Sequence, residues 1–407
     1  MPTNRGEDTL KLTAQCLCKS QTFTAPIPRS LLPLSAIYCH CTSCRRATGA
    51  LYSTYVPWPG DGGAIGASSL QRYVFAGSVT LLFCGVCGST MFAETVADDG
   101  SSGGGQPQYG VQTGVLANIP DIPGGVVKIA HHVFVDDTLD GGATPWLRDI
   151  NADGSQARLW RGRRGGEEIS SSSPHHASFS REARKEDDEK EIPIRCHCGG
   201  VDLALRHPVA EYATTPQSEL PWFIDPVSKK SLGGFDACDS CRLSSGADIF
   251  HWTFALLRHL SFPKVSSSSS AKFPASSIEL KSAVEASPAD RDPRWGTLAF
   301  YASSPGVQRY FCSRCSACVF YAADDRPDLV DVAIGLLSSR SGARAEGLLS
   351  WDYGGKMVWR EDVSGGWREG FVERVEAAAD AWRMERGYPK NWRRIQKEAA
   401  AMKDLRE

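Results

Sequence analysis

Short hydrophobic runs bounded by glycine, proline and aspartate dominate the pattern of hydrophobic and polar positions along most of the chain. The clearest runs are rich in β-branched and aromatic residues and cover residues 51–56, 249–254 and 329–334. Runs of this length and composition are typical of strands. The pattern therefore predicts a mainly β protein.

The hydrophobic period changes near the C-terminus. Apolar residues recur there at helical spacing, at Val372, Val375, Ala378, Ala379 and Trp382, and Pro389 interrupts the pattern before a second, charged segment. Proline ends a helix because it lacks an amide hydrogen and its ring blocks the preceding turn. We predict a helical extension over residues 370–407 that packs on the domain before it.

The 14 cysteines form two sets of seven with the same internal order: a Cys-x-Cys pair, a tighter cluster and a Cys-x-x-Cys pair. The first set is Cys16, Cys18, Cys39, Cys41, Cys44, Cys84 and Cys87; the second is Cys196, Cys198, Cys238, Cys241, Cys312 and Cys315, with Cys318 left over. The flanking residues repeat too, since residues 44–50 and 241–247 both end in Gly-Ala. Such an internal repeat predicts two homologous domains, over residues 10–150 and 191–369.

The segment between the two domains has a different composition. Residues 161–191 are rich in glycine, serine and charge and hold almost no large apolar side chain. Such a segment cannot bury enough surface to fold alone. We predict a disordered linker over residues 151–190, and we interpret similar tracts at residues 98–108 and 266–270 as loop insertions.

Composition narrows the class of protein. The chain has 42% hydrophobic residues and a net charge of −2, and its basic runs are short, so no nucleic-acid surface is predicted. Residues 1–12 lack the apolar stretch of a signal peptide or membrane anchor. We therefore expect a cytoplasmic or nuclear protein with no membrane partner. Thiols stay reduced in those compartments, so the cysteines need a role other than disulfide bonds.

The outer cysteine pairs suit structural zinc, which prefers four soft ligands in a tetrahedron. We predict one such site in each half, on Cys16, Cys18, Cys84 and Cys87 and on Cys196, Cys198, Cys312 and Cys315. The alternatives are buried or disulfide-bonded cysteines, or a redox-active Cys-x-x-Cys pair. A redox pair normally opens a helix, whereas residues 89–92, which follow the pair in the first half, have the pattern of a strand.

The middle cluster of the first half has a different character. Three thiolates, from Cys39, Cys41 and Cys44, could hold one metal ion and leave a fourth position for substrate, so we interpret them as catalytic. The alternatives are a noncatalytic zinc site completed by His40, or three reduced thiols. In an extended chain His40 would point away from its neighbours. Three other histidines suit structural positions in strands better than the role of a base, namely His131, His132 and His251.

The motifs Cys-x-Cys, Cys-x-Cys-x-x-Cys-Arg and Phe-Cys-x-x-Cys, with Arg45 and Gly49 in order, resemble the family of glutathione-dependent formaldehyde-activating enzymes, which includes centromere protein V. The resemblance covers residues 10–150. It implies two tandem Mss4-like, tent-shaped β domains. It also implies a structural zinc on the outer cysteine pairs and a second zinc on the middle cluster, near which glutathione binds.

The second half matches the family pattern less well. Alignment places Asp236 where Cys39 stands in the first half, and Ser316 replaces the glycine at Gly88. A metal site on Asp236, Cys238 and Cys241 is compatible with zinc chemistry. A hard oxygen in place of a thiolate weakens thiol-selective metal binding, so we expect this site to be degenerate.

The resemblance implies a zinc-dependent carbon–sulfur lyase or synthase that acts on glutathione adducts of small aldehydes, such as S-hydroxymethylglutathione. Arg45 or Arg46 would then pair with a glutathione carboxylate, because the guanidinium group matches that anion; the alternative is a solvated surface pair. The competing hypothesis for the whole chain is a noncatalytic, zinc-stabilised binding or scaffold module.

Overall fold

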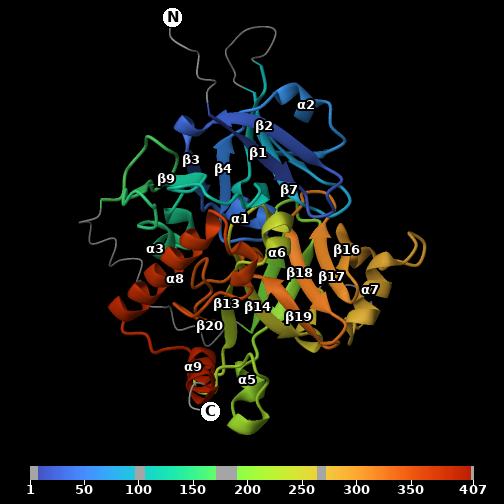
Figure 1. The fold of residues 1–407 in the computed structure, drawn as a ribbon. Coiled ribbons are helices and arrows are strands. Elements are labelled where there is room, and N and C mark those ends of the chain that lie inside the picture. The colour runs from blue at the N-terminus through green and yellow to red at the C-terminus, as the bar shows by residue number, and fades with distance from the viewer. Residues whose placement is uncertain (1–7, 97–105, 171–189, 264–271, 405–407) are drawn as a thin grey trace, which may run out of the picture.

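The computed structural model describes residues 8–96, 106–170, 190–263 and 272–404. Most of its regular elements are strands, arranged in four sheets, and long helices occur only near the C-terminus (Figure 1). The predicted fold class, mainly β with a C-terminal helical extension, is confirmed. No helix among these residues has the length and apolar character needed to cross a membrane.

The first half contains a hairpin and a large sheet. Strands β1 (Thr9–Gln15) and β2 (Thr22–Pro28) pair antiparallel. The main sheet comprises β3 (Leu34–Cys39), β4 (Ser53–Pro57), β5 (Gln71–Ala76), β6 (Val79–Phe83), β7 (Thr90–Thr95), β8 (Gln108–Val111), β9 (Val127–Val133) and β10 (Arg158–Leu159). Its helices are short: α1 (Thr42–Thr48), α2 (Gly62–Gly66), α3 (Thr144–Leu147) and the 3-10 turns η1 (Arg29–Leu31), η2 (Thr113–Val115) and η3 (Asp136–Thr138).

The second half repeats this plan. A small sheet holds β11 (Glu191–Arg195), β12 (Asp202–Arg206) and β15 (Leu260–Ser261), and the main sheet holds β13 (Ser231–Asp236), β14 (Phe250–Leu256), β16 (Leu298–Ser304), β17 (Val307–Cys312), β18 (Cys318–Ala323), β19 (Leu329–Ala333) and β20 (Leu349–Trp351). Its helices are α5 (Val209–Tyr212), α6 (Asp239–Ser245), α7 (Ser277–Glu285), η4 (Gln217–Glu219), η5 (Leu257–His259), η6 (Pro293–Trp295), η7 (Ile334–Leu336) and η8 (Arg360–Val363). Helices α8 (Arg368–Glu385) and α9 (Trp392–Asp404) end the described chain.

The two main sheets have the same strand order. The first runs β9-β3-β4-β8-β7-β6-β5 after its edge strand β10, and the second, taken from its other edge, runs β20-β13-β14-β19-β18-β17-β16. Each strand of the second sheet therefore has a counterpart in the first. Helices α1 and α6 follow the equivalent strands β3 and β13. The hydrophobic runs identified in the sequence correspond to β4, β14 and β19.

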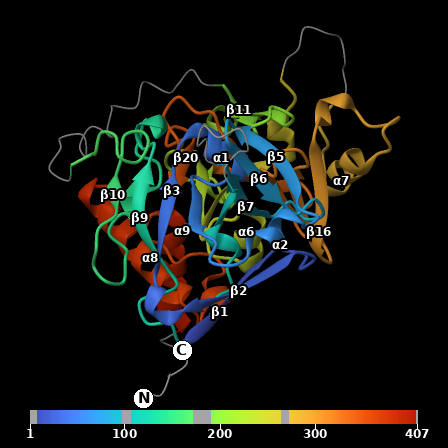
Figure 2. The same cartoon turned by 90° about the horizontal axis from the view of Figure 1, so that it is seen from above.

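The first half lies above the second half in Figure 1, and Figure 2 looks down on the first half from above. One continuous cluster of buried hydrophobic side chains contains residues of both halves. Two equivalent backbone hydrogen bonds cross the interface: Gly335 N donates to Gly49 O at 2.9 Å, and Gly114 N donates to Gly246 O at 2.8 Å. The contact therefore has approximate two-fold symmetry.

A buried ion pair joins three parts of the chain. Arg368 of α8 lies 2.9 Å from Asp248 of the second half, and both side chains are buried. The carboxylate of Asp248 also accepts hydrogen bonds from Tyr38 at 3.1 Å and from Thr113 at 2.5 Å, both in the first half. Because a buried charge is stable only when it is paired and hydrogen-bonded, this cluster requires the halves and α8 to be assembled together.

The position of the C-terminal extension adds to one prediction. Helix α8 packs against α3 of the first half as well as against the second half. Arg374 Nε donates to Ile150 O at 2.5 Å, and Glu376 accepts from Met357 N at 2.7 Å. The predicted packing on the second half is present, and contacts with the first half must be added to it, because the apolar face of α8 covers surface contributed by both halves.

The predicted linker is also shorter than expected. Strand β10 pairs parallel with β9, and Trp160 and Ile169 are buried. Arg161 contacts Asp136 and Glu167 in ion pairs of 2.9 and 2.7 Å. Residues 151–170 thus belong to the first half, because a few buried apolar side chains anchor an otherwise polar segment, namely Ala157, Leu159, Trp160 and Ile169. Residues 171–189, and most of the two predicted loop insertions, lie outside the described residues.

Candidate functional site

Four cysteines of the first half meet at the tips of two hairpins. Cys16 and Cys18 lie between β1 and β2, and Cys84 and Cys87 lie between β6 and β7. The Cys18 sulfur lies 3.5 Å from the Cys16 sulfur and 3.6 Å from the Cys84 sulfur. All four sulfurs lie within 4.8 Å of one another. Zinc–sulfur bonds of about 2.3 Å require sulfur separations of about 3.8 Å, whereas a disulfide is about 2.05 Å. The four free thiols therefore fit a zinc ion.

The second half contains an equivalent group. The Cys198 sulfur lies 3.5 Å from Cys196 and 3.5 Å from Cys312, and Cys315 completes a set within 4.8 Å. Hydrogen bonding from Cys315 lowers the pKa of Cys198 to about 6. Ser316 keeps the turn of its glycine counterpart by adopting a left-handed backbone with φ of 64°. The loss of that glycine has therefore not broken the cysteine cluster.

The middle cluster of the first half is formed by a strand end and a helix start. Cys39 is the last residue of β3, Cys41 precedes the first turn of α1, and Cys44 lies within that turn. Cys41 Sγ accepts from Cys39 Sγ at 3.5 Å and from Cys44 N at 3.3 Å. Hydrogen bonds from Cys39 and Cys44 lower the pKa of Cys41 to about 3. The cluster thus favours a thiolate, the form that binds metal.

The neighbouring histidines face away from this cluster. His40 Nε2 lies 2.8 Å from His132 Nδ1, and both rings are fully buried. Burial lowers the pKa of both imidazoles. His131 lies 3.2 Å from the Trp160 indole nitrogen, and His251 packs among aromatic rings of both halves. The middle metal-competent group of the first half therefore consists of Cys39, Cys41 and Cys44 without His40.

The two arginines after the cluster have contacts within the protein. Arg45 is buried and donates from Nε to His40 O at 3.2 Å and from Nη2 to Thr42 Oγ1 at 2.9 Å, which holds the cysteine loop in place. Arg46 Nη2 donates to Ser338 Oγ of the second half at 2.7 Å. Carboxylate binding by either arginine stays a prediction.

Residues 11–137 match the model of the family described as glutathione-dependent formaldehyde-activating enzyme. This segment of the chain is similar to that family. The matched segment includes all seven cysteines of the first half. No curated protein matches the chain. Together with the cysteine clusters, the family indicates a glutathione-related, zinc-binding activity.

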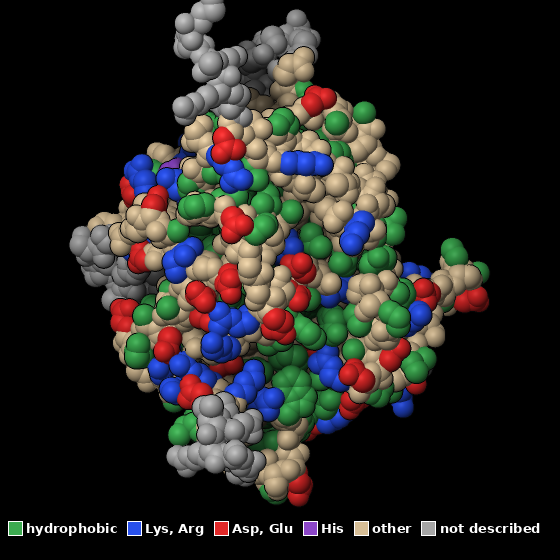
Figure 3. Space-filling model, viewed as in Figure 1, with side chains coloured by type: hydrophobic (Ala, Val, Ile, Leu, Met, Phe, Trp, Pro, Cys, Tyr) green, Lys and Arg blue, Asp and Glu red, His purple; other side chains and the backbone are tan. Residues whose placement is uncertain are grey.

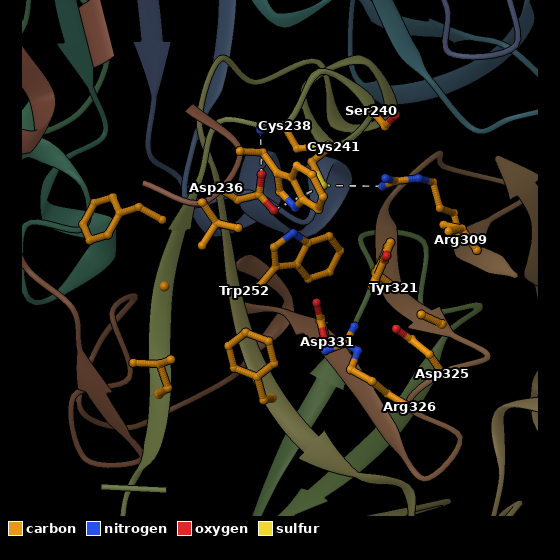
Figure 4. Close-up of a pocket in the computed structure, with 18 of the residues that line it drawn as sticks. Asp236, Cys238, Ser240, Cys241, Trp252, Arg309, Tyr321, Asp325, Arg326 and Asp331 are labelled. Carbon is orange, nitrogen blue, oxygen red and sulfur yellow. Dashed lines mark hydrogen bonds and ion pairs between the residues drawn. The ribbon is translucent and has the colours of Figure 1, made fainter. Parts of the chain in front are cut away.

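Outside the matched residues 11–137, three residues of the second half form a group of their own. Asp236 Oδ1 accepts from Cys238 N at 2.7 Å, and the Cys241 thiol donates to Asp236 Oδ2 at 3.4 Å (Figure 4). One ligand atom from each of the three residues lies within 4.8 Å of the others. Burial raises the pKa of Asp236 to about 7. The substitution of aspartate for cysteine has thus preserved a set of donors that could bind metal.

This second group opens on a cavity of about 1000 Å³. The walls come mainly from β13, β14, β17, β18 and β19, and Figure 3 shows a hydrophobic hollow flanked by basic and acidic side chains. Sequence reasoning missed this cavity because its side chains come from strands far apart in the chain. The available signal was polar residues within otherwise hydrophobic strands, Arg309 in β17 and Asp331 in β19.

Proposed function

We propose that the first half, which contains the matched residues 11–137, is a zinc-dependent enzyme that forms or cleaves the carbon–sulfur bond of glutathione adducts of small aldehydes, in the class of carbon–sulfur lyases. The observation that carries the proposal is the convergence of the Cys39, Cys41 and Cys44 sulfurs within 4.8 Å of one another. Zinc sites with three protein ligands keep a position for substrate or water, whereas sites with four are structural.

In the direction of synthesis, the glutathione sulfur would attack the carbonyl carbon of the aldehyde. The new carbon–sulfur bond forms, the carbonyl π electrons move to oxygen, and the thiol proton ends on that oxygen, so no atom is lost. Cleavage is the reverse. A bound zinc ion would supply Lewis acidity, which stabilises a thiolate or polarises a carbonyl.

The chain's own residues would prepare this chemistry. The three cysteines would hold the metal, and the amide of Cys44 stabilises the Cys41 thiolate at the start of α1. Arg45 fixes the loop through the carbonyl of His40. Arg46 remains the proposed partner for a glutathione carboxylate, although its guanidinium contacts Ser338 in the structure without ligand.

We also propose that residues 191–369 form a second domain of the same type. The common strand order and the equivalent cysteine clusters support this assignment. All 14 cysteines are free, which suits the reducing conditions of the cytoplasm or nucleus, where glutathione is kept reduced.

Replacing Cys39 by serine should abolish adduct formation without unfolding the protein. Removing a ligand should cost more than the roughly 10–100-fold that is typical of outer-shell changes at metal sites. The thermal transition should persist because the outer cysteines are unchanged. The measurements are the rate of adduct formation from formaldehyde and glutathione, the zinc content and the thermal midpoint.

The matched control is Cys238→Ser, which makes the same change in the second half and should leave formaldehyde turnover intact. Full turnover by Cys39→Ser would contradict the proposal. About two zinc ions per chain that glutathione leaves in place, with no turnover by the unaltered protein, would instead favour the noncatalytic scaffold.

A further inference from the structure

One end of the cavity of the second half is formed by side chains that could bind a metal ion. Asp236, Cys238 and Cys241 present oxygen and sulfur donors, which suit zinc. Arg309 Nη1 donates to the Cys241 sulfur at 3.5 Å, and Figure 4 shows the guanidinium directed toward it. Arg309 is buried and is held by Ser303 at 3.1 Å. A fixed cation therefore lies beside the metal-competent group.

Aromatic side chains form much of the remaining wall. The rings of Trp252, Phe254 and Tyr321 line the cavity, and Trp222 and Trp359 lie where the wall reaches solvent, with 42% and 54% of their surface exposed. Aromatic rings supply large apolar area and stack with other rings. These walls favour a ligand that carries an aromatic or similarly flat apolar group.

Trp359 has an unusual backbone as well as an exposed ring. Its φ is 58°, a left-handed conformation that is rare for bulky residues. Strained backbone of this kind is concentrated at ligand-binding positions. What distinguishes Trp359 is its position in the cavity wall, with its indole exposed at the solvent end.

Five basic side chains and six aspartates line the same cavity. The basic side chains are Arg309, Arg326, Lys356, Arg393 and Lys397, and the acidic ones are Asp236, Asp324, Asp325, Asp331, Asp352 and Asp362. Arg326 forms an ion pair with Asp331 at 3.0 Å. Among the residues that the structure describes, the other three exposed-end cations, Lys356, Arg393 and Lys397, have no carboxylate within ion-pair distance. Arg393 lies over the Trp222 ring, with 5.3 Å between the guanidinium carbon and the ring centroid. These positive charges suit a ligand with carboxylate groups near its exposed end.

The first half has different residues at the equivalent positions. The strand registers relate Trp252 to Tyr55, Arg309 to Leu81, Tyr321 to Ala93 and Asp331 to Gly110. The second half has therefore gained two charges and an aromatic ring where the first half has small or aliphatic residues. A site that had only lost its function would not be expected to acquire such a set.

We propose that the second-half cavity is a separate binding site for a thiol conjugate that carries both an aromatic group and carboxylates. Its sulfur end lies toward Asp236, Cys238 and Cys241, its aromatic group lies against the tryptophans, and its carboxylates face the three cations. This ligand is bulkier than a small-aldehyde adduct. The proposal is independent of turnover at Cys39, Cys41 and Cys44.

The test uses the full zinc-loaded chain and S-benzylglutathione as the probe, with binding followed by titration calorimetry and tryptophan fluorescence. S-methylglutathione lacks the ring, and benzyl mercaptan lacks the carboxylates. We expect one site for S-benzylglutathione, with at least about tenfold weaker binding of either comparison compound, since each lacks one of the two recognised groups. Equal affinity for S-methylglutathione and S-benzylglutathione would overturn the proposal.

Variants locate the site. Trp359→Ala should weaken S-benzylglutathione binding by about 2–10-fold, in the range of an aromatic pair. Phe134→Ala is the matched control, because Phe134 is also exposed, at 39%, and also has a left-handed φ of 56°. Asp236→Asn should lower the zinc content and the affinity together. Loss of binding in Cys41→Ser with full binding in Trp359→Ala would place the ligand in the first half and refute the assignment.

Discussion

Replacing Cys84 by serine is expected to unfold the whole chain rather than the first half alone. The four-cysteine group that includes Cys18 and Cys84 joins the two hairpins of the first half. The binding free energy of a structural zinc ion is about 10–16 kcal/mol. That range is comparable to the entire stability of a typical protein, about 5–15 kcal/mol. Because one buried cluster contains residues of both halves, the second half would lose its packing partner.

The mirror variant Cys312→Ser tests the same idea from the other side. Cys312 occupies the equivalent position in the second half, 3.5 Å from the Cys198 sulfur. Both variants should show one cooperative loss of circular dichroism and near-ultraviolet signal, at a much lower temperature than the unaltered protein. A zinc chelator should have the same effect. Two separate transitions, with one half unaffected, would show that the halves are independent domains.

The cysteine clusters could be predicted because metal chemistry restricts their spacing. Pairs such as Cys16 and Cys18 are useful only if a second pair completes the tetrahedron, so the repeat along the chain indicates which thiols should meet. Strands were predictable for a related reason. A buried strand such as residues 249–254 can be predicted from its own residues, because β-branched and aromatic side chains are enriched in strands.

The contact between the halves could not be predicted in this way. Gly114 and Gly335 look like ordinary loop glycines in the sequence, and their role depends on backbone from the other half. The same holds for Asp248, whose partners lie in the first half and in α8. The fold of residues 151–170 was missed because the buried residues Leu159 and Trp160 form only a short apolar stretch in a polar segment.

The middle clusters of the two halves illustrate a second limit of prediction from the sequence. Alignment showed that Asp236 replaces a cysteine, and the substitution alone suggested loss of function. The surroundings lead to the opposite proposal, since Arg309 and Trp252 face the same cavity as Asp236. Such an environment is created by strand pairing, which no single segment of the sequence reveals.

Replacing Gly335 or Gly114 by alanine should destabilise the protein by disrupting the contact between the two halves. A Cβ atom at Gly335 would lie 2.0 Å from Ala50 O, and one at Gly114 would lie 2.4 Å from the carbonyl carbon of Gly246. Both neighbours are backbone, which cannot move aside as a flexible side chain can. We expect each substitution to lower the free energy of unfolding by about 3 kcal/mol or more, at the upper end for overpacking.

Gly162→Ala is the matched control, because nothing lies within 4 Å of a Cβ atom at that position. It should change stability by less than about 0.5 kcal/mol, as surface substitutions do. Denaturant unfolding of the zinc-loaded chain measures all three variants. Comparable losses at Gly114 and Gly335 are expected because the two contacts are symmetry equivalents. A change below about 1 kcal/mol at both would show that the halves do not approach as closely as the hydrogen bonds to Gly49 and Gly246 require.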